Sequence, residues 1–293
     1  MTLIPRRIHV GVLALQGAFS EHIQLLKKAF VVLEALPHGD FTWTCAEIRT
    51  SAELATCDAL IIPGGESTAI SLVAARSELL DLLRIFVKYQ FLPYLASARS
   101  HLSRVNRKPT WGTCAGLILL AEAANRTKKG GQDLIGGIDV RVNRNHFGRQ
   151  MESFEMDINL PFLNSLDIEV SSFSQRPFRG IFIRAPIVEK ILPQTTGVHT
   201  EEEQNPGTVV APSRMRETPT GIRYTPVEIM ATLPGRRVAR SPGLETSCDG
   251  DIIAVRQRNV FGTSFHPELT DDARIHVWWL MQISTAFCDP VGR

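Results

Sequence analysis

Short runs of consecutive apolar residues alternate along the chain with longer segments in which apolar positions recur every three or four residues. The first pattern is typical of strands buried inside a sheet, and the second of amphipathic helices. The predicted strands span residues 8–15, 59–62, 110–111, 138–142, 154–158, 181–183, 227–231, 252–257 and 260–264. The predicted helices span residues 19–33, 67–72, 78–89, 117–124 and 272–287. This alternation predicts an α/β fold with three α/β/α layers around a mostly parallel sheet.

The pattern is interrupted in two places, which we interpret as surface insertions. Residues 94–107 add basic side chains before a strand, and we expect a solvated loop or, as an alternative, a contact for a partner. Residues 193–226 are rich in Pro, Gly, Thr and Glu, and this character continues more weakly to residue 250. Such a composition predicts a mobile or disordered loop. We therefore predict one domain over residues 1–293, with insertions at about 94–107 and 193–250.

Composition and charge exclude several classes of protein. Hydrophobic residues make up 44% of the 293 residues and charged residues 21%, as in ordinary soluble globular proteins. A net charge of +2 gives no electrostatic reason to expect binding to nucleic acid or to a membrane surface. No apolar run approaches the ~20 residues of a membrane-spanning helix. The five cysteines are odd in number and lack C-x-x-C spacing, which favours a reduced, cytoplasmic protein.

The segment Gly112-Thr113-Cys114-Ala115-Gly116 carries the clearest chemical signal. A short strand leads into it and a helix follows it, which is the pattern of a nucleophile elbow with cysteine as the nucleophile. Small residues on both sides allow the tight turn that projects the side chain outward. A cysteine at the first turn of a helix also lies at the positive end of the helix dipole, which favours the thiolate.

A second segment, Ser264-Phe265-His266-Pro267-Glu268, supplies a base and an orienting carboxylate. Residues two apart in an extended chain point to the same side, and Pro267 favours an extended His266. Glu268 then fixes the tautomer of the imidazole, whose other nitrogen reaches Cys114. The alternative is a buried structural cysteine and a loop histidine that never meet. The presence of both motifs in one chain favours a triad of Cys114, His266 and Glu268.

The predicted strands direct four segments to one place. Gln16-Gly17, Gly64-Gly65-Glu66, Cys114 and His266 each follow a predicted strand directly. In open α/β sheets the ligand binds beyond the carboxyl ends of the strands. We therefore expect these segments to converge at one edge of the sheet.

These motifs resemble those of class I triad glutamine amidotransferases and, more closely, those of the glutaminase subunits of pyridoxal 5'-phosphate synthases. The matching blocks are Gly11-Val12-Leu13-Ala14-Leu15-Gln16-Gly17-Ala18-Phe19, Ile62-Pro63-Gly64-Gly65-Glu66-Ser67-Thr68, Gly112 to Leu117, Arg144-Asn145-His146-Phe147-Gly148-Arg149-Gln150, Phe182-Ile183-Arg184-Ala185-Pro186 and Ser264 to Thr270. Many amidotransferases share the Cys and His-x-Glu blocks. The Leu-Gln-Gly, Gly-Gly-Glu-Ser and Asn-x-Phe-Gly-Arg-Gln blocks point to the vitamin B6 branch.

The resemblance implies a flavodoxin-like fold and a glutaminase that hydrolyses L-glutamine to L-glutamate and ammonia. It also implies that the substrate is bound by Gly65, Glu66, Ser67, Arg144, Ile183 and Arg184. The backbone N–H groups of Gly65 and Ala115 are the expected oxyanion donors. By the same resemblance, the ammonia passes to a separate synthase subunit that builds pyridoxal 5'-phosphate. We expect no cofactor and no metal in this chain.

Control by the partner is a further expectation. The Gly64-Gly65 pair can turn a backbone N–H toward or away from the site at little steric cost. The candidate docking residues, whose alternative role is helix capping and packing, are Phe19, Ser20, Glu21 and His22. Three other functions remain open: a glutaminase of another biosynthetic pathway, a related cysteine hydrolase or peptidase, and a noncatalytic regulatory subunit of the same fold.

Overall fold

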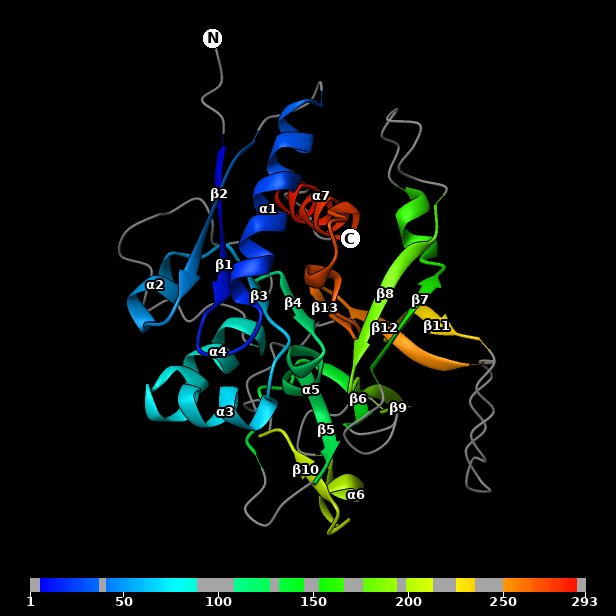
Figure 1. Ribbon diagram of the computed structural model, residues 1–293. Coiled ribbons are helices and arrows are strands. Elements are labelled where there is room, and N and C mark those ends of the chain that lie inside the picture. The colour runs from blue at the N-terminus through cyan, green and yellow to red at the C-terminus, as the bar shows by residue number, and fades with distance from the viewer. Residues whose placement is uncertain are drawn as a thin grey trace.

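The computed structural model places helices around a large central sheet (Figure 1). It describes residues 6–36, 41–88, 108–126, 132–144, 153–165, 176–193, 199–212, 225–234 and 250–288. The predicted insertion at 94–107 lies outside these residues, as do residues 194–198, 213–224 and 235–249 of the second predicted insertion.

In the described part of the chain, an 11-stranded sheet has the order β10-β5-β6-β9-β12-β13-β4-β3-β1-β2, with β11 paired to β12. Its strands are β1 (Arg6–Leu13), β2 (Phe41–Ile48), β3 (Ala59–Ile62), β4 (Thr110–Thr113), β5 (Ala121–Asn125), β6 (Ile138–Asn143), β9 (Ile187–Ile191), β10 (Thr208–Val210), β11 (Glu228–Leu233), β12 (Asp251–Gln257) and β13 (Val260–Thr263). Two further strands, β7 (Ser153–Ile158) and β8 (Phe178–Ile183), form a separate antiparallel pair.

The half of the sheet that contains β2, β1, β3, β4 and β13 is parallel throughout. Strands such as β3 are buried along their whole length, as parallel strands covered on both faces must be. Because these strands point the same way, their carboxyl ends meet at one edge. The segments that follow β1, β3, β4 and β13 are the four that the sequence directs to a common site.

Helices cover both faces of the parallel half. They are α1 (Phe19–Glu34), α2 (Ser51–Thr56), α3 (Ser67–Arg76), α4 (Leu79–Lys88), α5 (Ala115–Leu120) and α7 (Arg274–Cys288). The short helix α6 (Thr200–Glu203) packs beside β10 at the other edge of the sheet, and the described residues also form the 3₁₀ turns η2 (Pro161–Ser165) and η3 (Pro267–Leu269). Helices α1 and α7 pack together, and α3 packs against α4 and α5 (Figure 1). None of the helices that the structure describes is long and apolar enough to cross a membrane.

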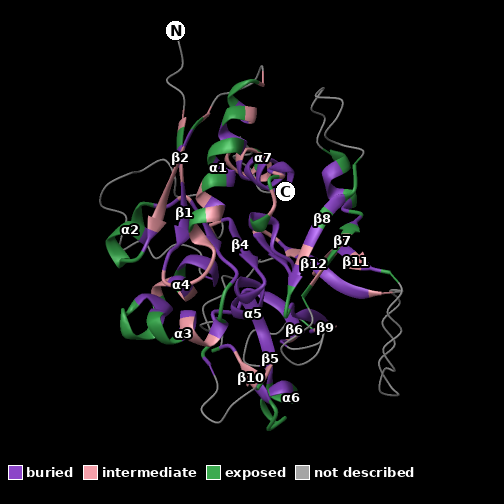
Figure 2. Cartoon of the chain, in the orientation of Figure 1, coloured by how far each residue is buried: buried purple, intermediate pink, exposed green. Residues whose placement is uncertain are grey.

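Two hydrophobic cores lie on the two faces of the sheet. Along β3, Ala59 and Ile61 pack with α1 and α7, whereas Leu60 and Ile62 pack with α3, α4 and α5. This alternation follows from the two-residue period of a strand. Figure 2 shows the resulting layering, with buried strands in the middle and exposed residues on the outer surfaces of α2 and α3. The predicted α/β fold class is confirmed.

One predicted helix is shorter than expected. The apolar, alanine-rich run after Gly116 was expected to stay helical to Ala124, but α5 ends at Leu120 and the chain continues directly as β5. Ala121 has extended backbone angles, φ −70° and ψ 146°. Pairing of β5 with both β6 and β10 outweighs the local helix propensity.

The expectation of a mobile loop over residues 193–226 is wrong for the part that the structure describes. Residues 199–212 contain α6 and β10, and β10 pairs with β5. Glu202 is buried, and its carboxylate accepts hydrogen bonds from Arg141 at 2.5 Å and from Lys190 at 3.3 Å, which compensate for the loss of water. These ion pairs and the strand pairing order a segment whose composition alone predicts disorder.

Candidate active site

Cys114 occupies a sharp turn between β4 and α5. Its φ of 45° and ψ of −97° are rare for a residue with a side chain and cost on the order of 1–3 kcal/mol. The surrounding backbone holds this conformation, since the N–H of Cys114 donates to the carbonyl of Thr263 at 2.8 Å. Thr263 is the last residue of β13, so the same contact ties the turn to the strand that leads to His266.

The glycines of the elbow allow close backbone approach. A Cβ on Gly116 would lie 2.1 Å from the carbonyl oxygen of Ile62, and a Cβ on Gly112 would lie 2.4 Å from the carbonyl carbon of Gly116. Both distances are far inside van der Waals contact. The strand–turn–helix geometry expected from the motif is therefore present.

His266 and Glu268 form a buried pair beside this turn. Nδ1 of His266 lies 2.8 Å from Oε1 of Glu268, and His266 is 6% exposed and Glu268 3%. The expected extended His-Pro-Glu segment is wrong, because Pro267–Leu269 forms the 3₁₀ turn η3. The tighter turn still brings the carboxylate to the imidazole. A Cβ on Gly64 would lie 2.3 Å from Cε1 of His266, so only a glycine lets the loop after β3 lie against the ring.

The environment of His266 favours the imidazolium. Burial alone lowers the pKa of His266, but the charge and hydrogen bond of Cys114 and the contact with Glu268 raise it more, to about 10. Cys114 is therefore near enough to His266 for its charge to act on the pKa of the imidazole. The thiol also lies 3.9 Å from the carbonyl oxygen of Ile183, at the end of β8.

The loop after β3 is held by the loop after β1. The N–H of Ala18 donates to the carbonyl of Gly64 at 3.0 Å, and the N–H of Glu66 donates to Oε1 of Gln16 at 2.7 Å. Gly17 has a φ of 100°, and a Cβ there would lie 2.0 Å from the oxygen of Gly64. These contacts bring Gly64 and Gly65 to the edge of the sheet where Cys114 and His266 lie, as expected from the order of the strands.

Glu66 begins α3 as its N-cap. Its carboxylate accepts hydrogen bonds from the N–H groups of Thr68 at 3.1 Å and Ala69 at 2.6 Å. Burial raises the pKa of Glu66. These hydrogen bonds and the charge of Arg144 together lower it by more, so the net pKa is below its usual value. Glu66 is therefore an anion close to a buried guanidinium.

Arg144 reaches the first turn of α3 from the end of β6. Its Nη2 donates to the hydroxyls of Ser67 at 2.9 Å and Thr68 at 3.1 Å, and both hydroxyls donate to Oε1 of Gln132. Arg144 is 8% exposed, and burial lowers its pKa although Glu66 acts in the opposite direction. Gln132 is buried in this network, and no sequence motif singled it out.

The remaining predicted residues are placed differently. Ala115 is the first residue of α5, directly after the nucleophile turn. The backbone carbonyl of Ile183 contacts the thiol of Cys114. Arg184 is exposed, and its backbone has a positive φ of 47°. Arg149 and the rest of the Asn145–Gln150 block lie outside the described residues.

His22 differs from expectation because it is completely buried and so offers no docking surface. Its Nε2 lies 3.4 Å from Oε2 of Glu268 and 3.2 Å from the hydroxyl of Thr113. Its Nδ1 lies 3.0 Å from Nε2 of His276 on α7. The sequence signal for this arrangement is weak, because two histidines 254 positions apart share no local pattern.

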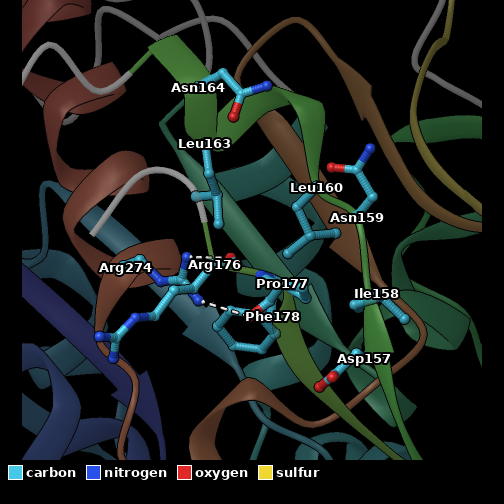
Figure 3. Close-up of a pocket in the computed structure, with 10 residues that line it drawn as sticks. All are labelled: Asp157, Ile158, Asn159, Leu160, Leu163, Asn164, Arg176, Pro177, Phe178 and Arg274. Atoms are coloured by element: carbon cyan, nitrogen blue, oxygen red, sulfur yellow. Dashed lines mark hydrogen bonds between the residues drawn. The ribbon is translucent and has the colours of Figure 1, made fainter. Parts of the chain in front are cut away.

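A cavity of about 460 Å³ lies elsewhere, between β7, β8 and the start of α7 (Figure 3). Arg274 points into its wall and donates to the carbonyls of Arg176 at 2.7 Å and Pro177 at 3.1 Å. Cys114, His266 and Glu268 do not line this cavity. Residues 166–175, which connect two of its walls, lie outside the described part of the chain.

Together, the fold and site define an α/β protein with a cysteine elbow and a His–Glu pair at the carboxyl ends of parallel strands. The model of the SNO glutamine amidotransferase family matches residues 12–221 and 238–285, and the chain belongs to this family. This confirms the family that the motifs predicted.

Individual relatives agree with this family. The chain is 37% identical over 273 residues to the probable pyridoxal 5'-phosphate synthase subunit PDX2 of Arabidopsis thaliana, covering 92% of this chain and 84% of the relative. It is 34% identical over 284 residues to the pyridoxal 5'-phosphate synthase subunit PdxT of Acidothermus cellulolyticus, covering 97% and 98%. A solved structure described as a glutamine amidotransferase is 29% identical, covers 94% of this chain and 98% of its own, and has a TM-score of 0.55.

Proposed function

We propose that this chain is the glutaminase subunit of a pyridoxal 5'-phosphate synthase, and that Cys114, His266 and Glu268 are its catalytic triad. The names of its relatives support the pathway. The observation that carries the triad is the 2.8 Å contact between His266 and Glu268 beside a cysteine in a strained elbow. Since both hydrophobic cores pack on one sheet, we also infer a single domain.

The chemistry starts at the thiolate of Cys114. It attacks the side-chain amide carbon of glutamine, and the carbonyl oxygen becomes an oxyanion in the tetrahedral intermediate. The imidazolium of His266 gives its proton to the amide nitrogen, so the C–N bond breaks and ammonia leaves a thioester behind. His266 then takes a proton from water, whose oxygen attacks the thioester, and glutamate and the thiolate are released.

Stabilisation of the oxyanion falls to two backbone donors. Ala115 follows the nucleophile at the N-terminus of α5, where the N–H groups of a helix have no internal partner. Gly65 is the second donor, on the loop that Ala18 and Gln16 hold in place. Preorganised donors of this kind are each worth ~10²–10³-fold in rate.

Binding of the substrate involves Gly65, Glu66, Ser67, Arg144, Ile183 and Arg184. The guanidinium of Arg144 suits the α-carboxylate of glutamine, because charged hydrogen bonds to carboxylates are strong when water is excluded. Gln132 supports this cation through the hydroxyls of Ser67 and Thr68. The ammonia is delivered to a separate synthase subunit, which also raises glutaminase turnover.

The test uses Cys114→Ala with Cys45→Ala as its control, each assayed with a pyridoxal 5'-phosphate synthase subunit. We expect Cys114→Ala to lose glutamate production by on the order of 10⁴-fold or more, while Cys45→Ala retains it. Cofactor synthesis by the Cys114→Ala complex should persist with ammonium chloride and fail with glutamine. Parental glutaminase activity in Cys114→Ala would reject the triad. Failure of the native chain to bind any such synthase would reject the pathway.

A further inference from the structure

A buried polar chain lies behind the proposed triad, and the reaction scheme above does not use it. His22 on α1 lies between Glu268 and His276, with Thr113 of β4 beside it. Both histidines are 0% exposed, and each makes a T-shaped ring contact with Trp111. Polar side chains at such depth cost stability unless their hydrogen bonds have a specific arrangement.

The direction of these hydrogen bonds follows from Glu268. An ionised carboxylate only accepts, and Oε1 already accepts from His266. Oε2 is fully buried and has no hydrogen-bond partner among the described residues, and Nε2 of His22 lies 3.4 Å from it. A proton on Nε2 of His22 is the arrangement that avoids setting two lone pairs against each other at this distance, and the Thr113 hydroxyl at 3.2 Å accepts from the same N–H.

This assignment fixes the next link. A neutral His22 with its proton on Nε2 has a bare Nδ1, which accepts from Nε2–H of His276 at 3.0 Å. The remaining nitrogen of His276, Nδ1, is then also bare. It has no hydrogen-bond partner among the described residues, which agrees with a nitrogen that carries no proton needing an acceptor.

We propose that His22 is a positioning residue for the reaction: its Nε2–H restrains Oε2 of Glu268, so that Oε1 stays aligned with His266, while His276 fixes the tautomer of His22. This inference rests on the proposed triad. The terminal torsion of a glutamate side chain is broad, so one hydrogen bond to Oε1 leaves the carboxylate free to rotate. A second restraint on Oε2 removes that freedom.

A neutral donor suits this position better than a cation. Burial lowers the pKa of His22 well below its usual value, and the nearby His276 and His266 lower it further. Because His22 stays uncharged, it holds the carboxylate without competing with His266 for its negative charge. A lysine or arginine in the same place would partly neutralise Glu268 and weaken its effect on the imidazolium.

The experiment compares three variants in complex with the synthase subunit. His22→Leu removes the donor, and His22→Gln keeps an amide N–H close to the place of Nε2. Leu26→Ala is the control. Leu26 is buried one helical turn further along α1, and its apolar side chain has no donor for Glu268. We expect His22→Leu to lower kcat by on the order of 10–100-fold with KM for glutamine little changed, and His22→Gln to restore most of it.

A spectroscopic measurement separates positioning from general destabilisation. The Nδ1 proton of His266 should give a low-field proton NMR signal that disappears in His266→Asn. We expect this signal to shift or broaden in His22→Leu and to persist in Leu26→Ala and His22→Gln. An unchanged signal together with a kcat equal to that of Leu26→Ala would overturn the inference.

If His22→Leu does not fold, His22→Gln and His22→Asn decide the question. Asn places its amide close to the position of Nδ1 and cannot reach Oε2, so kcat should be lower for Asn than for Gln. Equal values or the reverse order would reject the role of His22. Full activity in the His22 variants beside an inactive Cys114→Ala would reject only this inference, whereas an active Cys114→Ala would reject the triad itself.

Discussion

The two carboxylate oxygens of Glu268 lie in different surroundings. Oε1 contacts the imidazole of His266, and Oε2 faces His22 in the interior. The side chain is almost completely shielded from water, so solvent does not screen its charge. The negative charge therefore acts mainly on His266, where it favours the protonated ring.

Glu268→Gln removes this charge while keeping the size of the side chain and one oxygen that can accept Nδ1–H. We expect glutamine to bind with a nearly parental KM, whereas kcat falls by on the order of 10²–10⁴-fold. His266→Asn should be at least as damaging. Steady-state kinetics of both variants with the synthase subunit test this. A neutral Glu268→Gln beside an inactive His266→Asn would make Glu268 structural and the site a Cys–His pair.

At the scale of elements, the contact between α5 and β3 shapes the elbow. Gly116 brings the first turn of α5 against the carbonyl of Ile62 as closely as a glycine allows. The N-terminus of the helix, with Ala115, is thereby held over the ends of the parallel strands. A change at this contact alters both the packing and the position of the nucleophile.

Gly116→Ala tests this contact. The added methyl group would have to lie 2.1 Å from a backbone oxygen, so α5 must shift away from β3. We expect the free energy of unfolding to fall by about 1–3 kcal/mol and kcat to fall with it. Gly207→Ala, between α6 and β10, is the control, because the nearest atom to its Cβ is the Asn205 side-chain oxygen at 3.3 Å. Urea unfolding and glutaminase assays should separate the two variants; equal behaviour would contradict the packing argument.

The elements that the sequence predicts are those whose pattern is local. Strand β3 is apolar throughout, and β12 and β13 each contain a short apolar run. The elbow has a fixed spacing of small residues. The alanine-rich β5 has no such signal, since its extended form depends on β6 and β10. Helix α2 was missed although its capping box, Thr50 with Glu53, is readable in the sequence.

The candidate site divides in the same way. Spacing within short segments identifies Cys114, His266 and Glu268, because their roles depend on neighbours in the chain. The buried position of His22 beside Glu268 and the contacts of Gln132 could not be predicted, because packing between distant segments puts these side chains in place. Histidine at the start of an amphipathic helix indicates a surface residue as readily as a core one.

At the scale of the whole molecule, the site draws on both helical layers. Helix α5 approaches from one face of the sheet, and α1 and α7 supply His22 and His276 from the other. The two cores therefore meet at the edge of the sheet where the proposed triad lies. The buried histidines His22 and His276 therefore affect both the free energy of unfolding and, by our proposal, the position of Glu268.

This dependence predicts how stability changes with pH. Burial lowers the pKa of His276 from 6.5 to about 3, so below pH 6.5 the unfolded chain binds a proton that the folded chain does not. The free energy of unfolding should fall as the pH decreases, by about 2 kcal/mol for this residue between pH 6.5 and about pH 5. Urea unfolding of the parent and of His276→Leu measures it, and we expect a shallower fall in the variant. Equal slopes would show that folding leaves the pKa of His276 unchanged.

His266 acts in the opposite range. Its pKa is raised to about 10, so its contribution to stability is complete below pH 6.5 and is lost as the pH rises toward 10. The same unfolding series extended to alkaline pH should show a second decline. The difference between the parent and His266→Asn should be largest below pH 6.5 and should shrink as the pH rises toward 10.

The burial of Cys57 has a consequence for covalent labelling. At the end of α2, burial raises the pKa of this thiol to about 11, so at neutral pH it is almost entirely in its unreactive form. Burial also raises the pKa of Cys45. Cys114 lies in the strained elbow near His266 and is the nucleophile of the proposed reaction. Among the cysteines whose surroundings the structure describes, we therefore expect an electrophilic probe to react mainly with Cys114. The fraction of the peptide containing Cys114 that carries the mass of the probe then measures the fraction of protein molecules whose site has reacted.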